Sequence, residues 1–166
     1  DKGDGTYRNP IIHADYSDPD ACHVGDDYYM TSSSFNCLPA LQILHSKDLV
    51  NWTIIGAAVP YELSPVEFPE KPQHGSRVWA PSIRYHKGEF YIFWGDPDQG
   101  AFMTKAKDPK GPWSEPVLVK AGKGIIDTTP LWDEDGKVYM VHGYAGSRSG
   151  IKSLLGICEL NADATK

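Results

Sequence analysis

The acidic residues near the start of the chain are the first candidates for chemistry. Three carboxylates lie within six residues there, next to a proline and just ahead of an aromatic run: Asp15, Asp18 and Asp20. A proline directly before a strand restricts the backbone and holds a neighbouring acid at the mouth of a sheet. Proton transfer in catalysis needs carboxyl groups that are positioned in this way. We therefore expect one of these acids to do chemistry.

The composition limits what the chain can be and what it can bind. Its 166 residues are 40% hydrophobic and 11% aromatic, which indicates one globular domain. A net charge of -6 without any Lys or Arg cluster argues against nucleic acid or an anionic membrane as a partner. No apolar run approaches the roughly 18 residues of a membrane span, and the three cysteines lie too far apart for a zinc site. A neutral or weakly polar substrate fits best.

The pattern of apolar and turn residues predicts an all-β fold. No ten-residue window shows the capped apolar periodicity of an amphipathic helix, and 16 glycines and 13 prolines interrupt the sequence throughout. Short aromatic and β-branched runs remain, and three proline-led hairpins repeat with turn glycines 63 and 48 residues apart: Gly25, Gly88 and Gly136. This spacing matches the roughly 40 to 50 residues of a four-stranded propeller blade, with one longer insertion at 61–76.

A propeller needs four or more blades to close, and this chain supplies about two and a half. We expect blade 1 at about 9–60, blade 2 at about 77–120 and the start of blade 3 at about 124–166. The remaining blades of the same domain are therefore an expected partner. A small β-sandwich is the alternative fold.

Five motifs in a fixed order carry a family resemblance. They occupy residues 9–10 with 17–20, 25–29, 45–52, 78–82, and 124–127 with 132–137. Together they resemble glycoside hydrolase family 43, the five-bladed propeller β-xylosidases and α-L-arabinofuranosidases. The resemblance covers essentially the whole chain, and it implies that these residues are the N-terminal half of a catalytic domain.

The resemblance implies roles for four residues. Asp18 is the general base, and Asp127, at the matching place in the third blade, holds the pKa and orientation of the general acid. Trp79 and Phe35 line the sugar-binding subsite, where an aromatic ring stacks on the apolar face of a sugar. The general acid is a Glu of a later blade, and no position here matches its motif. No cofactor is required; a structural calcium ion in the central channel is compatible with the family, but its ligands are not assignable.

Bland alternatives exist for these acids. An Asp before Pro often caps a turn, and Thr128 and Thr129 make a local hydrogen-bonded turn equally natural at Asp127. Asp15 and Asp20 are predicted to be structural or peripheral. The acidic turns at 26–27 and 133–135 lack the spacing of a calcium loop, so we expect solvated turn acids there.

The predicted function is that of an inverting glycoside hydrolase acting on hemicellulose-derived xylo- or arabino-oligosaccharides. Inversion needs a base and an acid about 6.5 to 9.5 Å apart, and residues from different blades meet at the axis of a propeller. The alternatives are a non-catalytic carbohydrate-binding propeller and an inactive fragment of such an enzyme. Because polymeric hemicellulose stays outside the cell, we expect a secreted or periplasmic protein; cleavage of imported oligosaccharides in the cytoplasm is the alternative.

Overall fold

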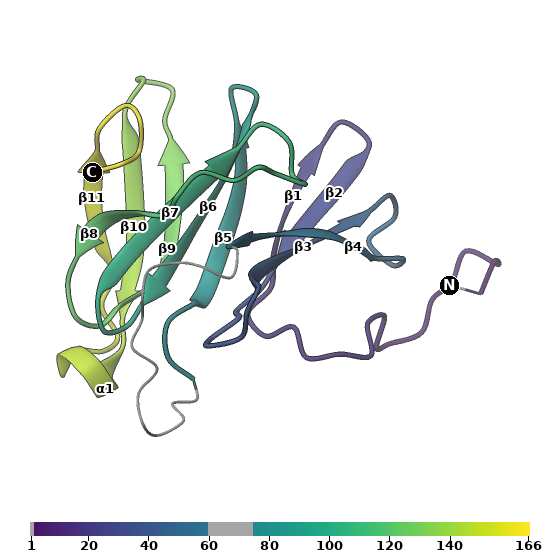
Figure 1. Ribbon diagram of the computed structural model, residues 1–166, viewed down its shortest axis with the longest axis horizontal. Coiled ribbons are helices and arrows are strands. Elements are labelled where there is room, and N and C mark those ends of the chain that lie inside the picture. Colours follow the sequence, from purple (N-terminus) through teal and green to yellow (C-terminus); the bar gives the residue numbers. More distant parts are fainter. Residues whose placement is uncertain (1, 60–74) are drawn as a thin grey trace.

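Three antiparallel β-sheets make up the computed structural model, which describes residues 2–59 and 75–166 (Figure 1). The first sheet contains, in spatial order, β1 (Asp20–Val24), β2 (Asp27–Thr31), β3 (Ala40–Ser46) and β4 (Thr53–Val59). The second contains β5 (Trp79–His86), β6 (Glu89–Asp96), β7 (Gly100–Ala106) and β8 (Val117–Ala121). The third contains β9 (Ile125–Trp132), β10 (Val138–Tyr144) and β11 (Gly156–Leu160), with the short helix α1 (Gly146–Ser149) between the last two. The predicted insertion at 61–76 lies almost entirely outside the described residues.

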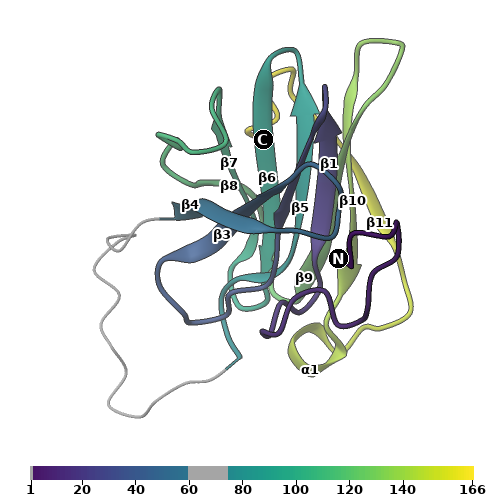
Figure 2. The same ribbon diagram turned by 90° about the vertical axis from the view of Figure 1, so that its right-hand side faces the viewer.

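The first strands of the three sheets lie next to one another. β5 packs between β1 and β9 without sharing a hydrogen-bonded ladder with either. The three strands begin at one edge of the molecule, and α1 lies beyond that edge in both views (Figure 1, Figure 2). This arrangement of consecutive meanders confirms the predicted propeller in place of a sandwich. Each sheet lies in one predicted blade segment, except that β8 ends one residue past the expected end of blade 2, and the blade limits stay a prediction.

Glycines make the hairpin turns that the sequence indicated. Gly25, Gly88 and Gly136 have φ values of 62°, 88° and 85°, a region that favours glycine because it has no Cβ. The turn between His86 and Glu89 has two residues, and Lys87 also has a positive φ of 47°. Two successive positive φ values are typical of the type I′ hairpin turn, whose twist matches that of the strands.

β6 carries both hydrophobic cores because it is buried on both faces. Phe90, Ile92 and Trp94 point into the cluster shared with the first sheet. Tyr91 and Phe93, which alternate with them, point into the cluster shared with the third sheet. Full burial of such side chains contributes about 1.5 to 3 kcal/mol each. The nearly continuous apolar run of this strand therefore reflects its position between two cores.

Two apolar side chains at the edge of the third sheet are exposed, because Leu155 lies just before β11 and Ile157 lies within it. Leu155 and Ile157 are 78% and 72% exposed there. No helix within residues 2–59 and 75–166 is long and apolar enough to cross a membrane.

Gly95, near the end of β6, allows the second and third sheets to approach closely. A Cβ at this position would lie 2.7 Å from the Cα of Ile126 and 2.8 Å from the carbonyl oxygen of Ile125. Both are backbone atoms, so no side chain can rotate away to make room. We predict that Gly95→Ala lowers the free energy of unfolding by about 1 to 3 kcal/mol, measured by urea denaturation.

Gly56→Ala is the matched control for this prediction. Gly56 also lies in a strand, but the nearest atom to an added Cβ there is 3.4 Å away, an ordinary van der Waals contact. Equal urea midpoints for the two variants would show that the sheets do not need this close approach.

Candidate active site

The four candidate residues lie at the edge where the first strand of each sheet, the inner strand, begins. Asp18 precedes β1 by two residues, Trp79 is the first residue of β5, and Asp127 is the third residue of β9. Phe35 follows the end of β2, which is antiparallel to β1 and so returns to the same edge. The three sheets thus each contribute to one edge of the fold.

The carboxylate of Asp18 is held by the buried hydroxyl of Ser33. The Ser33 Oγ donates a hydrogen bond to Asp18 Oδ2 at 2.7 Å and accepts one from the backbone N–H of Ala80 at 2.8 Å. The Ser33 backbone N–H also donates to the Ser17 carbonyl at 3.0 Å. Because Ala80 belongs to β5, this hydroxyl fixes the first sheet's acid relative to the second sheet. Sequence reasoning missed Ser33, since a serine after a strand carries no distinctive motif.

Several non-glycine residues at this edge have a left-handed backbone, among them the candidates Asp18, Phe35 and Asp127. The φ values are 49° at Asp18, 49° at Phe35, 32° at Ala80 and 55° at Asp127. This region is uncommon for residues other than glycine, and such strain tends to gather at functional sites. Asp18, Ala80 and Asp127 each lie two residues before a position where the inner strand pairs with its neighbour, namely Asp20, Ser82 and Thr129. A left-handed residue therefore precedes the regular strand pairing at this edge in each sheet.

The carboxyl group of Asp127 interacts electrostatically with that of Asp18. The pKa of Asp127 is raised, first because the surrounding chain displaces water from its carboxyl group and second because the Asp18 carboxylate is near. Gly143 lies beside it, since a Cβ added there would be 3.4 Å from Asp127 Oδ2. The structure therefore brings together the two acids that the sequence singled out, although they are 109 positions apart.

The two aromatic candidates come to the same edge by different routes. Phe35 forms an isolated β-bridge with Val78, the residue before Trp79, with N–H to O distances of 3.0 and 3.4 Å. The indole N–H of Trp79 donates to the carbonyl of Gly75 at 2.8 Å. The guanidinium of Arg148 lies 5.8 Å from the centre of the Trp79 ring.

Two other acidic residues have structural contacts. Asp20 accepts a hydrogen bond from the Ile83 backbone N–H at 2.8 Å and forms an ion pair with Arg84, so it ties the first sheet to the second. Asp27 interacts with His45 at 2.5 Å and with Lys47 at 2.8 Å. The prediction of a solvated turn acid is therefore wrong for Asp27, because His45 of β3 and Lys47, which directly follows β3, place two basic groups opposite it.

Metal ligands do not gather in the part of the chain that the structure describes. Within residues 2–59 and 75–166, no group of three or more His, Cys, Asp or Glu side chains lies close enough to hold a metal ion. A calcium ion is therefore assigned no ligand among these residues.

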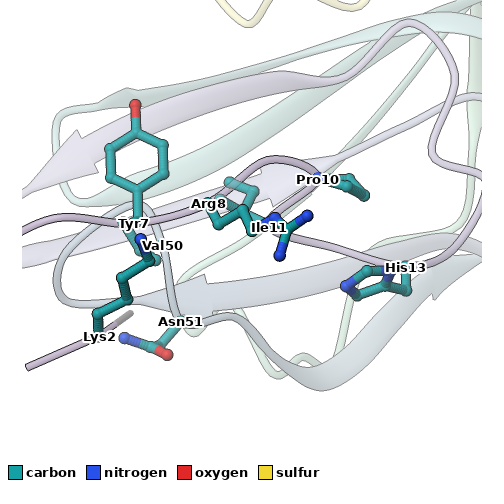
Figure 3. Close-up of a pocket in the computed structure, with 8 residues that line it drawn as sticks. All are labelled: Lys2, Tyr7, Arg8, Pro10, Ile11, His13, Val50 and Asn51. Carbon is teal, nitrogen blue, oxygen red and sulfur yellow. The ribbon is translucent and has the colours of Figure 1, made fainter.

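A shallow pocket elsewhere on the surface lacks the chemistry of a hydrolytic site. It lies between the N-terminal segment and the β3–β4 turn (Figure 3). This turn follows β3 and so lies at the end of the first sheet opposite to Asp18, which precedes β1. No carboxylate lines it; its residues are Lys2, Tyr7, Arg8, Pro10, Ile11, His13, Val50 and Asn51. We therefore place the candidate site at the edge that carries Asp18 and Asp127.

Comparison with known proteins gives consistent matches. The family model for glycosyl hydrolases family 43 matches residues 7–166. A beta-xylosidase of Formosa agariphila is 37% identical over 175 residues, which cover 100% of this chain and 30% of that protein. A non-reducing end alpha-L-arabinofuranosidase of Bacteroides ovatus is 42% identical over 141 residues, which cover 82% of this chain and 26% of that protein.

Solved structures resemble the chain over nearly its whole length. The family 43 protein BlXynB of Bacillus licheniformis has a TM-score of 0.77 and 34% identity, covering 96% of this chain and 31% of that one. The structural neighbours are five-bladed β-propellers, so the three sheets described above are part of such a propeller. The chain spans only about 26% to 31% of the length of these matched proteins.

The raised pKa of Asp127 predicts a pH-dependent gain in stability for Asp127→Asn. A carboxyl group whose pKa is higher in the folded state binds its proton more tightly there than in the unfolded chain. Its ionisation therefore destabilises the fold as the pH rises from the unfolded value of 3.8 through the raised folded value. Asn carries no charge and tolerates a left-handed backbone. We expect a higher Tm for the variant at pH 7 and no difference below pH 3.8.

Asp163→Asn is the control for this experiment. Asp163 is exposed and makes no hydrogen bond to any described residue, and its electrostatic interaction with Tyr91 and Lys105 is minor, so its substitution should change the Tm little at either pH. A Tm of Asp127→Asn equal to or below that of the parent at pH 7 would contradict the raised pKa.

Proposed function

The chain belongs to glycosyl hydrolases family 43, whose model spans residues 7–166, and we propose that it is part of an inverting glycosidase. The substrate class is carbohydrate, and we propose more narrowly that the bond cleaved is β-xylosidic or α-L-arabinofuranosidic. Relatives named beta-xylosidase and alpha-L-arabinofuranosidase support both sugars. One observation carries the proposal: Asp18, just before β1, and Asp127, in β9, lie at the same edge of the fold, and the Asp18 charge contributes to the raised pKa of Asp127.

Asp18 is suited to act as the general base. Asp18 Oδ2 accepts the hydrogen bond from Ser33, while Asp18 Oδ1 has no hydrogen-bond partner among the described residues. The free oxygen is therefore the one that would take a proton from the attacking water. Because Ser33 is itself fixed by the Ala80 N–H, the carboxylate does not need to reorient during the reaction.

Asp127 is suited to modulate the general acid. Its carboxyl group lies near Asp18 and is partly shielded from water, so it adds negative charge beside any acid that faces the base. Nearby negative charge raises the pKa of a carboxylic acid and keeps it protonated for the leaving oxygen. The acid itself would be a Glu outside this chain, because no position here matches its motif.

Trp79 and Phe35 are suited to form the sugar-contacting wall. Both are partly exposed at the edge that carries Asp18, and the bridge from Phe35 to Val78 places them on adjoining segments. Aromatic rings give contact area to the apolar face of a sugar without requiring hydrogen bonds.

Asp18→Asn should lower kcat by at least about 100-fold, because it preserves the shape of the side chain and removes the proton acceptor. The measurement is release of 4-nitrophenol from its β-D-xylopyranoside and α-L-arabinofuranoside, in a protein that extends to the length of its relatives. Asp15→Asn, at an exposed acid three positions away, is the control and should retain parental activity. Substantial activity of Asp18→Asn would exclude Asp18 as the base. Binding of sugar without any turnover by the parent would instead favour a carbohydrate-binding propeller.

Ser33→Ala should lower kcat by about tenfold, because it removes a hydrogen bond to a charged carboxylate. Ser33→Thr, which keeps the hydroxyl, should recover most of this loss. Ser34→Ala is the matched control: its hydroxyl contacts the Ser32 carbonyl and the Leu41 N–H instead of Asp18. Equal effects of Ser33→Ala and Ser34→Ala would show that the hydroxyl has no specific part in holding the base.

A further inference from the structure

Arg148, on α1 of the third sheet, lies against the indole ring of Trp79 of the second sheet. We propose that Arg148 is a positioning residue: its guanidinium supports one face of the Trp79 ring and leaves the other face for the sugar. The inference rests on the proposed function, because it assigns Arg148 a part in the sugar site. Arg148 belonged to none of the motifs that the sequence analysis used.

Two interactions with named partners orient the Trp79 ring. Its N–H is held by the Gly75 carbonyl at 2.8 Å, and the Arg148 guanidinium lies 5.8 Å from its centre, within the range of a cation–π interaction. Among the described residues, no aromatic ring packs on it. By contrast, Trp94 stacks on Phe102 at 5.6 Å, and Trp132 stacks on a histidine at 4.6 Å. Trp79 therefore has a cation beside it where Trp94 and Trp132 have aromatic rings.

The guanidinium is itself held in a fixed orientation. Its Nε donates to Asp98 Oδ1 at 3.0 Å, and the Arg148 side chain is only 28% exposed. Asp98 lies in the turn after β6, and buried Asp96 organises that turn by accepting the Asp98 N–H at 2.9 Å and the Gln99 N–H at 3.2 Å. A partly buried, oriented charge of this kind supports a ring better than a freely moving one.

The backbone of α1 is fixed to the same turn. The Ala145 N–H donates to the Gly124 carbonyl at 2.8 Å, and the Gly124 N–H donates to the Pro97 carbonyl at 2.7 Å. A Cβ at Gly124 would lie 2.6 Å from the Cβ of Ser149, so only glycine lets α1 pack this closely. The backbone hydrogen bonds through Gly124 and the ion pair with Asp98 thus both place Arg148 beside the second sheet.

A fixed ring matters because stacking on a sugar requires one defined plane. A small displacement of a positioning group can weaken binding or catalysis substantially even when no contact to the reacting atoms is lost. Loss of Arg148 should therefore weaken substrate binding through Trp79 and leave the proton-transfer steps at Asp18 intact.

A double-mutant cycle tests this dependence in a protein that extends to the length of its relatives. We expect Arg148→Ala to raise KM for the 4-nitrophenyl glycosides by about threefold to tenfold with kcat nearly unchanged. In the Trp79→Ala background, Arg148→Ala should have no further effect on KM. Arg148→Lys keeps the charge without the planar fork and should give an intermediate KM.

Lys137→Ala is the matched control because it removes an ion pair on the same sheet, between Lys137 Nζ and Glu159 Oε2 at 3.0 Å, away from the site. It should leave KM unchanged. An unchanged KM in Arg148→Ala would overturn the inference. An increase of equal size with and without Trp79 would also overturn it, because Arg148 would then act independently of the ring.

Fluorescence separates this inference from the proposed function. The emission lost in Trp79→Phe reports the Trp79 ring, and we expect Arg148→Ala to make that component about twofold more accessible to acrylamide quenching. This readout does not depend on turnover, so a parent protein without glycosidase activity would reject the proposed function and still test the positioning of the ring. Unchanged quenching would overturn the inference.

Discussion

The burial of β6 on both faces is the constraint on which the rest of the structure depends. Its alternate side chains fill the core toward the first sheet and the core toward the third, so those two sheets are placed relative to each other through the second. The candidate site takes Asp18 from the first sheet, Trp79 from the second and Asp127 from the third. Its geometry is therefore set by two apolar cores, and only then adjusted by hydrogen bonds such as that from Ser33 to Asp18.

The site combines several features that are unfavourable for folding. Asp18 and Asp127 both have left-handed backbones, and their carboxyl groups repel each other. Contacts between sheets hold them in place, notably the Ser33 hydroxyl shared with the Ala80 N–H and the pairing of Asp20 with Arg84. Such a loss of stability at the site is expected when the strained geometry is needed for catalysis.

Local patterns predicted much of the fold, and contacts between distant residues account for what they missed. The turns at Gly25, Gly88 and Gly136 were predictable because glycine is the residue that most readily adopts a positive φ. The left-handed backbone at Asp18 and Asp127 was not, since Asp gives no such signal. Asp27 was taken for a solvated acid because its partners, His45 of β3 and Lys47 just after it, are 18 and 20 positions away. The placement of Asp18 and Asp127 together followed from the order of the motifs, whereas the parts played by Ser33 and Arg148 depend on neighbours 47 and 50 or more positions away.

The arrangement of each sheet as a meander has a consequence for the order in which the protein folds. Every strand pair within a sheet joins segments that follow one another along the chain, so the hairpins close short loops and can form early. The contacts that complete the site, from Ser33 to Ala80 and from Asp98 to Arg148, close far longer loops. The sheets that surround the site should therefore form before its catalytic side chains are brought together. Newly made or partly unfolded molecules would contain formed sheets and yet lack an assembled set of acids.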